Sequence, residues 1–408
     1  MQSAKSLPVV TGIGISSAVG IGKQAFTHAL RTGTTNFHFM SRPGRQNDSQ
    51  YIGAELPAAP LTCASIKPQL ARNNALTTQV ALVTLAEAWQ EARLDECNSE
   101  RIGLVVGGSN LQQRELLLTR QRYAREPSFL TPRYALTFMD TDISACLSEN
   151  FGIKGFAYSA GGASASGNLA LILAAQAVRQ GQVDVAICLG ALTDLSWWEC
   201  QGFRNIGAMG SHRFASQPDA ACRPFDRLSD GFIYGEACGA IVIESAEHAW
   251  RRQLSPWGEI HGYCHCIDAN RGPDANPAGE QQAITSALQQ AGWTAAQIDY
   301  VNPHGSGSAT GDKTELQALQ QSHLNHAWIN TTKSITGHSL TAAGCIEAIA
   351  TLLQIREGFV HPSLNLEMSA SQRFNWVRTA QSHQIKRALN LSYGFGGFNS
   401  AVCLAQPG

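Results

Sequence analysis

The sequence has little charge and almost no imbalance between charges of opposite sign. Charged residues make up 15% of its 408 residues, and 30 basic side chains stand against 31 acidic ones, for a formal net charge of −1. A chain without a basic excess lacks the electrostatic footprint of nucleic-acid binding. A hydrophobic fraction of 44% is also too high for extended disorder. The composition therefore predicts a compact, core-rich protein that has no nucleic-acid partner.

Long apolar runs and a secretory leader are missing as well. No apolar run approaches the roughly 20 residues that cross a bilayer, and residues 1–7 have no basic region followed by an apolar stretch. We therefore expect no membrane segment and a cytoplasmic location. In that compartment the 11 cysteines are expected to be reduced thiols rather than a disulfide framework.

What the sequence does contain is a regular alternation of strand-like and helical segments. Runs rich in valine and isoleucine alternate with helical patterns, which predicts α/β layering. The predicted strands include residues 9–13, 104–106, 183–189 and 240–243. A helix is predicted over residues 167–180, directly before the third of these strands.

A similar order of elements returns in the second part of the chain. The predicted elements there are a helix over 281–291, a strand over 298–301, and helices over 314–321 and 342–356. This repetition indicates a duplicated α/β unit. Because 408 residues exceed the usual single core, two or three domain equivalents are expected. We divide the chain near residue 250, into halves of residues 1–250 and 251–408.

Two motifs that could hold a cofactor or a metal fail on their spacing. Residues 12–14 read glycine-isoleucine-glycine after a strand, but they lack the third glycine and the acidic partner of a dinucleotide fingerprint. Cys264 and Cys266 flank His265, yet side chains alternate across an extended segment, so the histidine faces away from the two thiols. We therefore expect no metal and no bound cofactor, and we interpret residues 261–266 as an ordinary strand.

A run of small residues precedes the helix predicted over residues 167–180. Residues 159–167 consist only of serine, alanine and glycine. Small side chains allow backbones to approach closely where a helix exposes its free N–H groups, and such a place suits a nucleophile or an oxyanion. Ser164 lies at this junction. The run nearly matches a hydrolase nucleophile elbow, although its last position is Ser166 rather than glycine; a crowded helix start is the structural alternative.

Two histidines occupy comparable positions later in the chain. His304 follows a predicted strand on a glycine-loosened loop, and the carboxyl ends of strands commonly carry chemistry. His338 precedes a predicted helix. Near the C-terminus, glycines interrupt the strand-like residues 390–399, which implies closely approached backbone or a plain hairpin. Each segment alone is also explained by a structural role.

Taken together and in this order, these segments resemble the β-ketoacyl-acyl carrier protein synthases of the thiolase fold across nearly the whole chain. Residues 9–14 look like the opening strand of that family, and residues 223–226 with 230–232 look like its mid-chain motif. The histidine segments and the terminal glycine loop match too. The resemblance implies duplicated α/β halves in a layered αβαβα arrangement. It also implies an acyl group carried on the phosphopantetheine of an acyl carrier protein.

The resemblance assigns the catalytic positions residue by residue. The nucleophile position falls on Ser164, and the two active-site histidines are His304 and His338. Lys333 and Glu347 match the supporting lysine and glutamate of the family.

The substrate channel is assigned in the same way. Phe395 matches the gating phenylalanine, whose backbone N–H joins that of the nucleophile in an oxyanion hole. Ser306 and Ser308 match hydroxyl residues that line the pantetheine tunnel. Pro303 and Phe398 stand where the family usually has alanine and threonine, and both are expected to narrow the acyl pocket.

Serine at position 164 is the departure that changes the chemistry, because an elongating synthase carries cysteine there. A helix N-terminus can hold a thiol as thiolate, whereas a hydroxyl is far less acidic and needs a positioned base. Decarboxylation of a malonyl thioester needs no nucleophile, since two preorganised histidine donors can stabilise the enolate that loss of CO2 leaves.

The resemblance therefore implies the serine-bearing, decarboxylating branch of the family. Its members are standalone enzymes of polyketide β-branching cassettes in antibiotic biosynthesis, and they convert malonyl-acyl carrier protein to acetyl-acyl carrier protein. That product would feed a hydroxymethylglutaryl-type synthase. The family also implies a homodimer, in which the strand predicted at 183–189 pairs across a twofold axis.

Three other functions fit parts of the same pattern. A condensing β-ketoacyl synthase would use the same histidines. A non-catalytic partner similar to a chain-length factor would not need them intact. A serine acyltransferase or hydrolase would form a covalent acyl group on Ser164.

Overall fold

Two units of five strands with the same strand order build the protein. The structure is a computed structural model that describes residues 7–58 and 61–408. The first unit consists of β1 (Pro8–Ser17), β5 (Ile102–Gly107), β6 (Ala157–Ala160), β7 (Val185–Gly190) and β9 (Ala237–Ser245). The second consists of β10 (Gly258–Ile267), β11 (Tyr300–Asn302), β12 (Trp328–Ile329), β16 (Arg387–Gly394) and β17 (Phe398–Ala405).

The two units share both the order and the direction of their strands. When the strands of each unit are numbered in chain order, both sheets read third, second, fourth, fifth, first. The second strand pairs in parallel with the third and the fourth, and the other two pairings are antiparallel, in both units. The duplicated α/β unit expected from the sequence is therefore confirmed. We keep the division near residue 250, between β9 and β10, as a proposal that this repeat supports.

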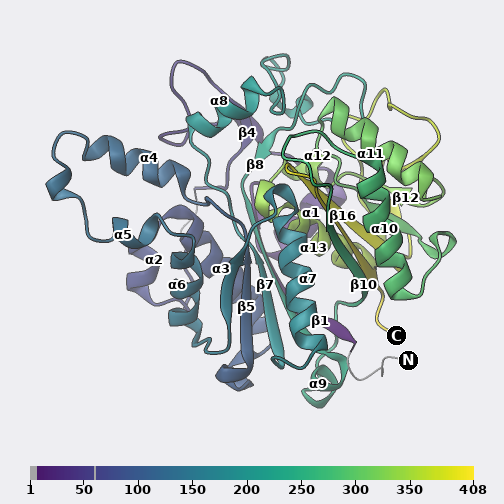
Figure 1. Ribbon diagram of the computed structural model, residues 1–408, viewed down its shortest axis with the longest axis horizontal. Helices are drawn as coiled ribbons and strands as arrows, with labels where there is room; N and C mark the ends of the chain where they lie inside the picture. The colour runs from purple at the N-terminus through teal and green to yellow at the C-terminus, as the bar shows by residue number, and fades with distance from the viewer. Residues whose placement is uncertain (1–6, 59–60) are drawn as a thin grey trace.

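Helices form three layers around the two halves of the sheet. Antiparallel pairing of β1 with β10 joins the halves into one sheet of 12 strands. Between the halves lie α7 (Ser166–Arg179) and α13 (Ala343–Glu357), which pack against each other and against strands of both units (Figure 1). On the outer faces lie α3 (Leu76–Glu91) and α6 (Thr141–Phe151) in the first unit, and α10 (Pro277–Ala291) and α11 (Ala309–Gln321) in the second. This is the layered αβαβα arrangement of a thiolase-like fold.

The composition of α13 explains why it lies at the centre. Every residue from Ala343 to Ile355 is buried. A helix that is apolar on all sides is covered on all sides, rather than packing one stripe onto a sheet. Its one buried acidic residue, Glu347, therefore needs a partner in the interior.

Shorter elements complete the described part of the chain. The helices are α1 (Lys23–Thr32), α2 (Pro68–Asn73), α4 (Gln113–Arg122), α5 (Tyr134–Thr137), α8 (Trp197–Asn205), α9 (Ala246–Arg251) and α12 (Lys333–Thr336). The strands are β2 (Gly20–Ile21), β3 (Phe37–Phe39), β4 (Ile52–Ala54), β8 (Tyr234–Gly235), β13 (Phe359–Val360), β14 (Asn375–Trp376) and β15 (Gln381–Ser382). Among residues 7–58 and 61–408, no helix combines the length and the apolarity needed to cross a membrane. All eleven cysteines are free thiols.

One expectation about assembly is wrong. The strand predicted at 183–189 is β7, and it pairs with β5 on one side and with β9 on the other. Both of its edges are occupied, so β7 cannot pair with a second chain. The first unit ends instead at β6, which among residues 7–58 and 61–408 pairs only with β5, so its other edge is open in this part of the chain.

Candidate active site

Ser164 lies on a tight turn between β6 and the central helix α7. Ala163, directly before it, has a positive φ of 48°, a conformation that costs energy for a residue with a side chain. The Ser166 hydroxyl secures the turn, because it accepts a bond from Gly162 N and donates to the Ala163 carbonyl. Across the turn, a Cβ at Gly394 would lie 2.5 Å from the Gly162 oxygen. The glycine loop near the C-terminus therefore packs directly on the Ser164 turn.

His338 lies five residues before the start of the other central helix, α13, and its side chain contacts Ser164. Its Nε2 lies 3.0 Å from the Ser164 hydroxyl oxygen, and its Nδ1 accepts a bond from the backbone N–H of Leu340 at 3.3 Å. Because Nδ1 is an acceptor, the proton of the neutral ring is on Nε2. His338 therefore donates to Ser164 and does not act as a base toward it.

His304 lies on the loop after β11, and Glu315 of α11 fixes its backbone. The Glu315 carboxylate accepts bonds from the N–H groups of His304 at 2.6 Å and Gly305 at 2.7 Å. Lys333 donates to the carbonyl of His304, and its Nζ lies 3.4 Å from the ring Nδ1. An ammonium group beside Nδ1 makes this nitrogen an acceptor, which leaves the second ring with its proton on Nε2 as well.

A buried ion pair lies behind the two rings. Lys333 bonds to Glu347, and both side chains are 2% exposed. Burial raises the pKa of Glu347 to about 7, although the charge of Lys333 opposes this shift. Burial, together with the Lys333 charge, lowers the pKa of His304 and of His338 well below the ordinary range. Both rings are therefore neutral at neutral pH.

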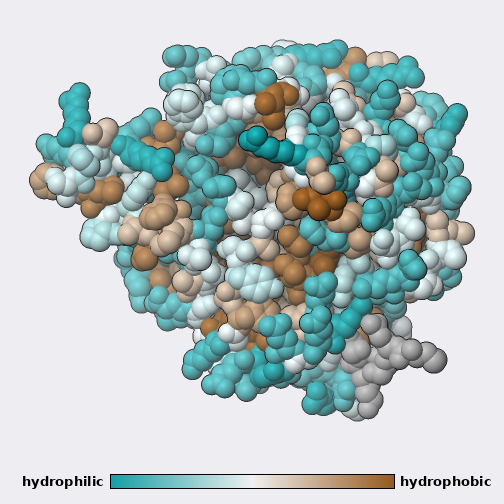
Figure 2. Space-filling view, viewed as in Figure 1, coloured by the Kyte–Doolittle hydropathy of each residue, from teal (hydrophilic) through white to brown (hydrophobic). Residues whose placement is uncertain are grey.

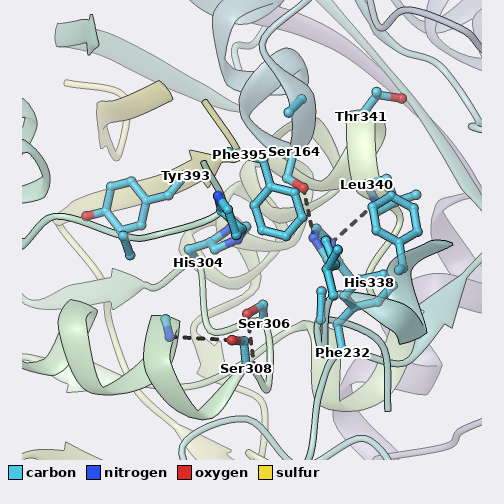
Figure 3. Close-up of a pocket in the computed structure, with 18 of the residues that line it drawn as sticks. Ser164, Phe232, His304, Ser306, Ser308, His338, Leu340, Thr341, Tyr393 and Phe395 are labelled. Atoms are coloured by element: carbon cyan, nitrogen blue, oxygen red, sulfur yellow. Dashed lines mark hydrogen bonds between the residues drawn. The ribbon is translucent and has the colours of Figure 1, made fainter. Parts of the chain in front are cut away.

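Ser164, His304 and His338 open onto one cavity of about 590 Å³. His304 and His338 cross at 81° with ring centroids 5.3 Å apart (Figure 3). Two N–H donors thus converge beside Ser164, which is the arrangement that stabilises an oxyanion. The wall of the cavity also includes Ser306 and Ser308.

The structure brings together most of the residues that the sequence points to. Phe395 lies in the cavity wall beside Ser164 (Figure 3), and the residue is 39% exposed. Lys333 and Glu347 lie behind the histidines rather than in the wall. Phe398 is not among the lining residues, because it points toward His265 and the Ser164 turn while its neighbours Gly397 and Asn399 face the cavity. The expectation that Phe398 narrows the pocket is therefore not met.

Sequence reasoning missed the acidic residues around His304. Asp312 binds Phe225 N and Gly307 N, just as Glu315 binds the His304 loop. Both carboxylates lie near the start of α11, which begins at Ala309 and has Ser308 as its N-cap. The helix predicted from the sequence starts at Thr314, five residues after the observed start, so the pattern does not place these two carboxylates beside the His304 loop. The serine cap after a glycine-rich loop was the available signal.

With this geometry established, comparison with known proteins identifies the family. Residues 8–249 match the beta-ketoacyl synthase N-terminal domain, and residues 257–367 match the beta-ketoacyl synthase C-terminal domain. The chain belongs to the β-ketoacyl synthase family. Its structure is similar to a beta-ketoacyl synthase from Burkholderia phymatum STM815, with a TM-score of 0.89 and 25% identity, over 98% of this chain and 100% of the other.

Within the family the chain is similar to a decarboxylating member. It is 50% identical to the polyketide biosynthesis malonyl-ACP decarboxylase PksF of Bacillus subtilis, over 97% of this chain and 95% of PksF. It is 31% identical to a putative polyketide beta-ketoacyl synthase 1 of Streptomyces cyaneus, over 98% of this chain and 97% of the relative. A further similar structure, with a TM-score of 0.85 and 25% identity over 98% of this chain and 99% of the other, is the ketosynthase of the AntDE:AntF complex with a type II polyketide acyl-carrier protein.

The assigned tautomers can be tested by nitrogen NMR on protein labelled at histidine. We expect His304 and His338 to carry their protons on Nε2 and to stay neutral as the pH falls through about 6.5, because their lowered pKa values keep the neutral form below the ordinary titration range. Alanine variants at each position assign the signals. Protonation of either ring near pH 6.5, or a proton on Nδ1, would contradict the assignment.

Proposed function

We propose that the chain is a malonyl-acyl carrier protein decarboxylase, which releases CO2 and leaves an acetyl group on the carrier. The similarity to PksF over nearly the whole chain supports this function. The observation that carries it is the hydrogen bond from His338 Nε2 to Ser164. A serine that accepts a bond from a neutral imidazole has no base to deprotonate it, so the acyl transfer that elongation requires is not prepared.

The two histidines account for the decarboxylation itself. The malonyl thioester oxygen would lie between the Nε2–H groups of His304 and His338, and it would replace the Ser164 hydroxyl as the acceptor of the His338 N–H. When the bond to the carboxylate breaks, its electron pair moves toward the thioester, and negative charge develops on that oxygen. Both donors are neutral and already oriented, so they stabilise this charge without reorganising. A proton then converts the enolate to the acetyl group.

The partner we propose is an acyl carrier protein, which presents the malonyl group on phosphopantetheine. Ser306 and Ser308 lie in the cavity wall and offer hydroxyl groups to the amides of this arm. The acetyl-carrier product fits a role in polyketide β-branching, where a hydroxymethylglutaryl-type synthase consumes acetyl groups. Both the branching role and the place in antibiotic biosynthesis are parts of this proposal.

The proposed function can be tested by incubating the protein with malonyl-carrier protein alone. We expect acetyl-carrier protein to form without any acyl acceptor, because the chemistry uses the histidines and no acyl-enzyme. Intact-mass measurement follows both the carrier and the enzyme. Efficient formation of a β-ketoacyl product would support a condensing synthase, an acyl group on Ser164 would support an acyltransferase, and no reaction would support a non-catalytic partner.

The three central side chains are expected to contribute unequally to the rate. His304→Ala and His338→Ala each remove a donor to the developing oxyanion and should lower the rate about 100- to 1000-fold. Ser164→Ala removes one hydroxyl hydrogen bond, a loss of about 1–2 kcal/mol, or about 5- to 30-fold. Decarboxylation by folded variants measures the ranking, with the exposed His326→Ala as control. A Ser164→Ala variant as inactive as the histidine variants would overturn the mechanism.

We also propose a homodimer, in which the open edge of β6 pairs with its copy across a twofold axis. Tyr158 on this strand is 40% exposed. Further exposed apolar residues lie on the side of α4 and α5 (Figure 2), and α5 packs on α6, which packs on β6. They are Phe129, Leu136, Phe138 and Met139. An edge strand beside exposed apolar surface is a template for pairing.

Light scattering tests this assembly. The wild type should be a dimer at micromolar concentration, and Tyr158→Asp should shift it toward monomer because a carboxylate would be buried at the new edge pairing. Trp250→Asp is the matched control: Trp250 is 79% exposed on α9, which packs against β1 and β9. A dimer that both variants leave intact would place the interface elsewhere.

A further inference from the structure

One wall of the cavity carries polar groups that the two histidine donors do not use. Glu280 and Tyr393 line the cavity together with His304. Glu280 is almost fully buried at 1% exposure, and its Oε2 has no hydrogen-bond partner among the residues that the structure describes. The Tyr393 hydroxyl is buried and also has no partner. Buried polar groups in proteins are nearly always paired, so two unpaired groups on one wall of a substrate cavity call for a functional explanation.

The start of α10 brings Glu280 to this wall. A Cβ at Gly279 would lie 1.8 Å from Asp268 Oδ1 and 2.6 Å from Asn399 Nδ2, so any larger residue would displace these two side chains from the start of the helix. Tyr393, at the end of β16, packs its ring against His304 with centroids 5.8 Å apart. Its hydroxyl points away from Ser164 (Figure 3).

The charges that face Glu280 are acidic. Glu315 and Asp312 approach from α11, and Asp268 from the segment after β10. Two of these carboxylates already have partners, since each accepts bonds from two backbone N–H groups around the His304 loop. These bonds favour the charged form and hold both side chains in place, but burial outweighs them, and it raises the pKa of Glu315 to about 8 and that of Asp312 to about 6. Glu280 Oε2 and Asp268 Oδ2 both lack a hydrogen-bond partner among the described residues, but Asp268 is only half-buried. Glu280 is buried and faces the other three carboxyl groups, so of this cluster it is the carboxyl best suited to carry a proton to the cavity.

Burial and the three neighbouring carboxylates raise the pKa of Glu280 well above its ordinary value. The neutral acid therefore persists to higher pH than that of an exposed glutamate. By the same effect, burial of the Glu280 charge reduces folding stability as the pH rises through the raised pKa.

The proposed reaction consumes one proton per turnover. Loss of CO2 leaves the electron pair of the broken C–C bond on the enolate, and a C–H bond must form before acetyl-carrier protein can leave. His304 and His338 are neutral donors to the oxygen, and a neutral imidazole is a poor acid toward carbon. The cavity therefore needs an acid other than the two histidines.

We propose that Glu280, which lines the same cavity as His304, supplies this proton to the enolate carbon. The Tyr393 hydroxyl then donates a hydrogen bond to the carboxylate that forms on Glu280. The O–H bond of Glu280 breaks as the C–H bond of the acetyl group forms, and solvent returns a proton to Glu280 before the next turnover. This inference rests on the proposed decarboxylation and adds a catalytic residue to it.

The reverse proton transfer gives a test that does not depend on decarboxylation. By microscopic reversibility, ionised Glu280 must remove a proton from the methyl group of acetyl-carrier protein, so the wild type should exchange these hydrogens with D2O. Mass spectrometry of the carrier follows the exchange. Glu280→Gln keeps the shape and removes the acid, and it should slow exchange about 100-fold or more. Glu280→Asp should restore part of the rate, and Tyr393→Phe should lose less than Glu280→Gln.

The pH dependence of decarboxylation gives a second test. The forward reaction uses neutral Glu280, so its rate should fall as the pH rises through the raised pKa, while exchange should rise over the same range. Asp268→Asn removes one of the carboxylates that raise the pKa of Glu280. The fall of the decarboxylation rate and the rise of the exchange rate should therefore both move to lower pH. Glu280→Gln should lose the falling limb of the forward reaction.

The outcomes separate the two proposals. A wild type that leaves malonyl-carrier protein unchanged defeats the proposed function. A wild type that decarboxylates it, with a folded Glu280→Gln variant that matches the wild type in exchange and in pH profile, defeats the role of Glu280 alone. If exchange is too slow to detect in the wild type, the pH profile of decarboxylation is the deciding measurement. A Glu280→Gln variant whose decarboxylation rate falls with rising pH as that of the wild type does would overturn the proposal. Thermal unfolding of each variant shows that the fold is intact.

Discussion

The ammonium group of Lys333 is the charge around which the site is built. It is buried and bonds to Glu347 on the central helix α13. It also donates hydrogen bonds to the backbone carbonyl and to the ring Nδ1 of His304. Replacing a buried ion pair with apolar residues is often neutral or stabilising, so the pair is weak evidence of a stabilising role. Its local effect is specific: a cation behind the rings disfavours a second positive charge on either imidazole. Two neutral rings, each with its proton directed into the cavity, are the consequence.

The duplicated topology explains why three side chains from distant parts of the chain meet. Ser164 lies between the third strand of the first unit and the central helix α7, and His338 lies between the third strand of the second unit and the central helix α13. The two helices pack against each other, so their starts come together with the residues they carry. His304 adds the end of a neighbouring strand, β11. Ligands in open α/β sheets bind at the carboxyl ends of strands, and here residues that follow three such ends, those of β6, β11 and β12, line one cavity.

Local sequence was sufficient for much of this arrangement. The helix predicted at 167–180 agrees with α7 to within a residue at each end, because its apolar residues recur with helical spacing after a run of small ones. The positions of His304 and His338 beside a strand and a helix followed from the same reasoning. The prediction that β7 pairs across a dimer axis failed because it depends on three-dimensional neighbours. The composition of β7 predicts a strand, but it does not show that β5 and β9 pair with both of its edges. The sequence did not point to Glu280 as a site residue for a similar reason, because its acidic neighbours lie on other elements of the fold.

The hydroxyl at position 164 also determines where the product remains. A thiol at a helix N-terminus beside histidine donors would be partly ionised and would accept the acyl group from the carrier. The acyl group would then be bound covalently to the enzyme, as condensation requires. In the proposed reaction, a hydroxyl that accepts a bond from His338 keeps its proton, and the thioester would stay on the phosphopantetheine of the carrier. The same histidine donors would then serve carbon–carbon bond cleavage alone, because the group that captures the substrate in a condensing synthase has no base to remove its proton here.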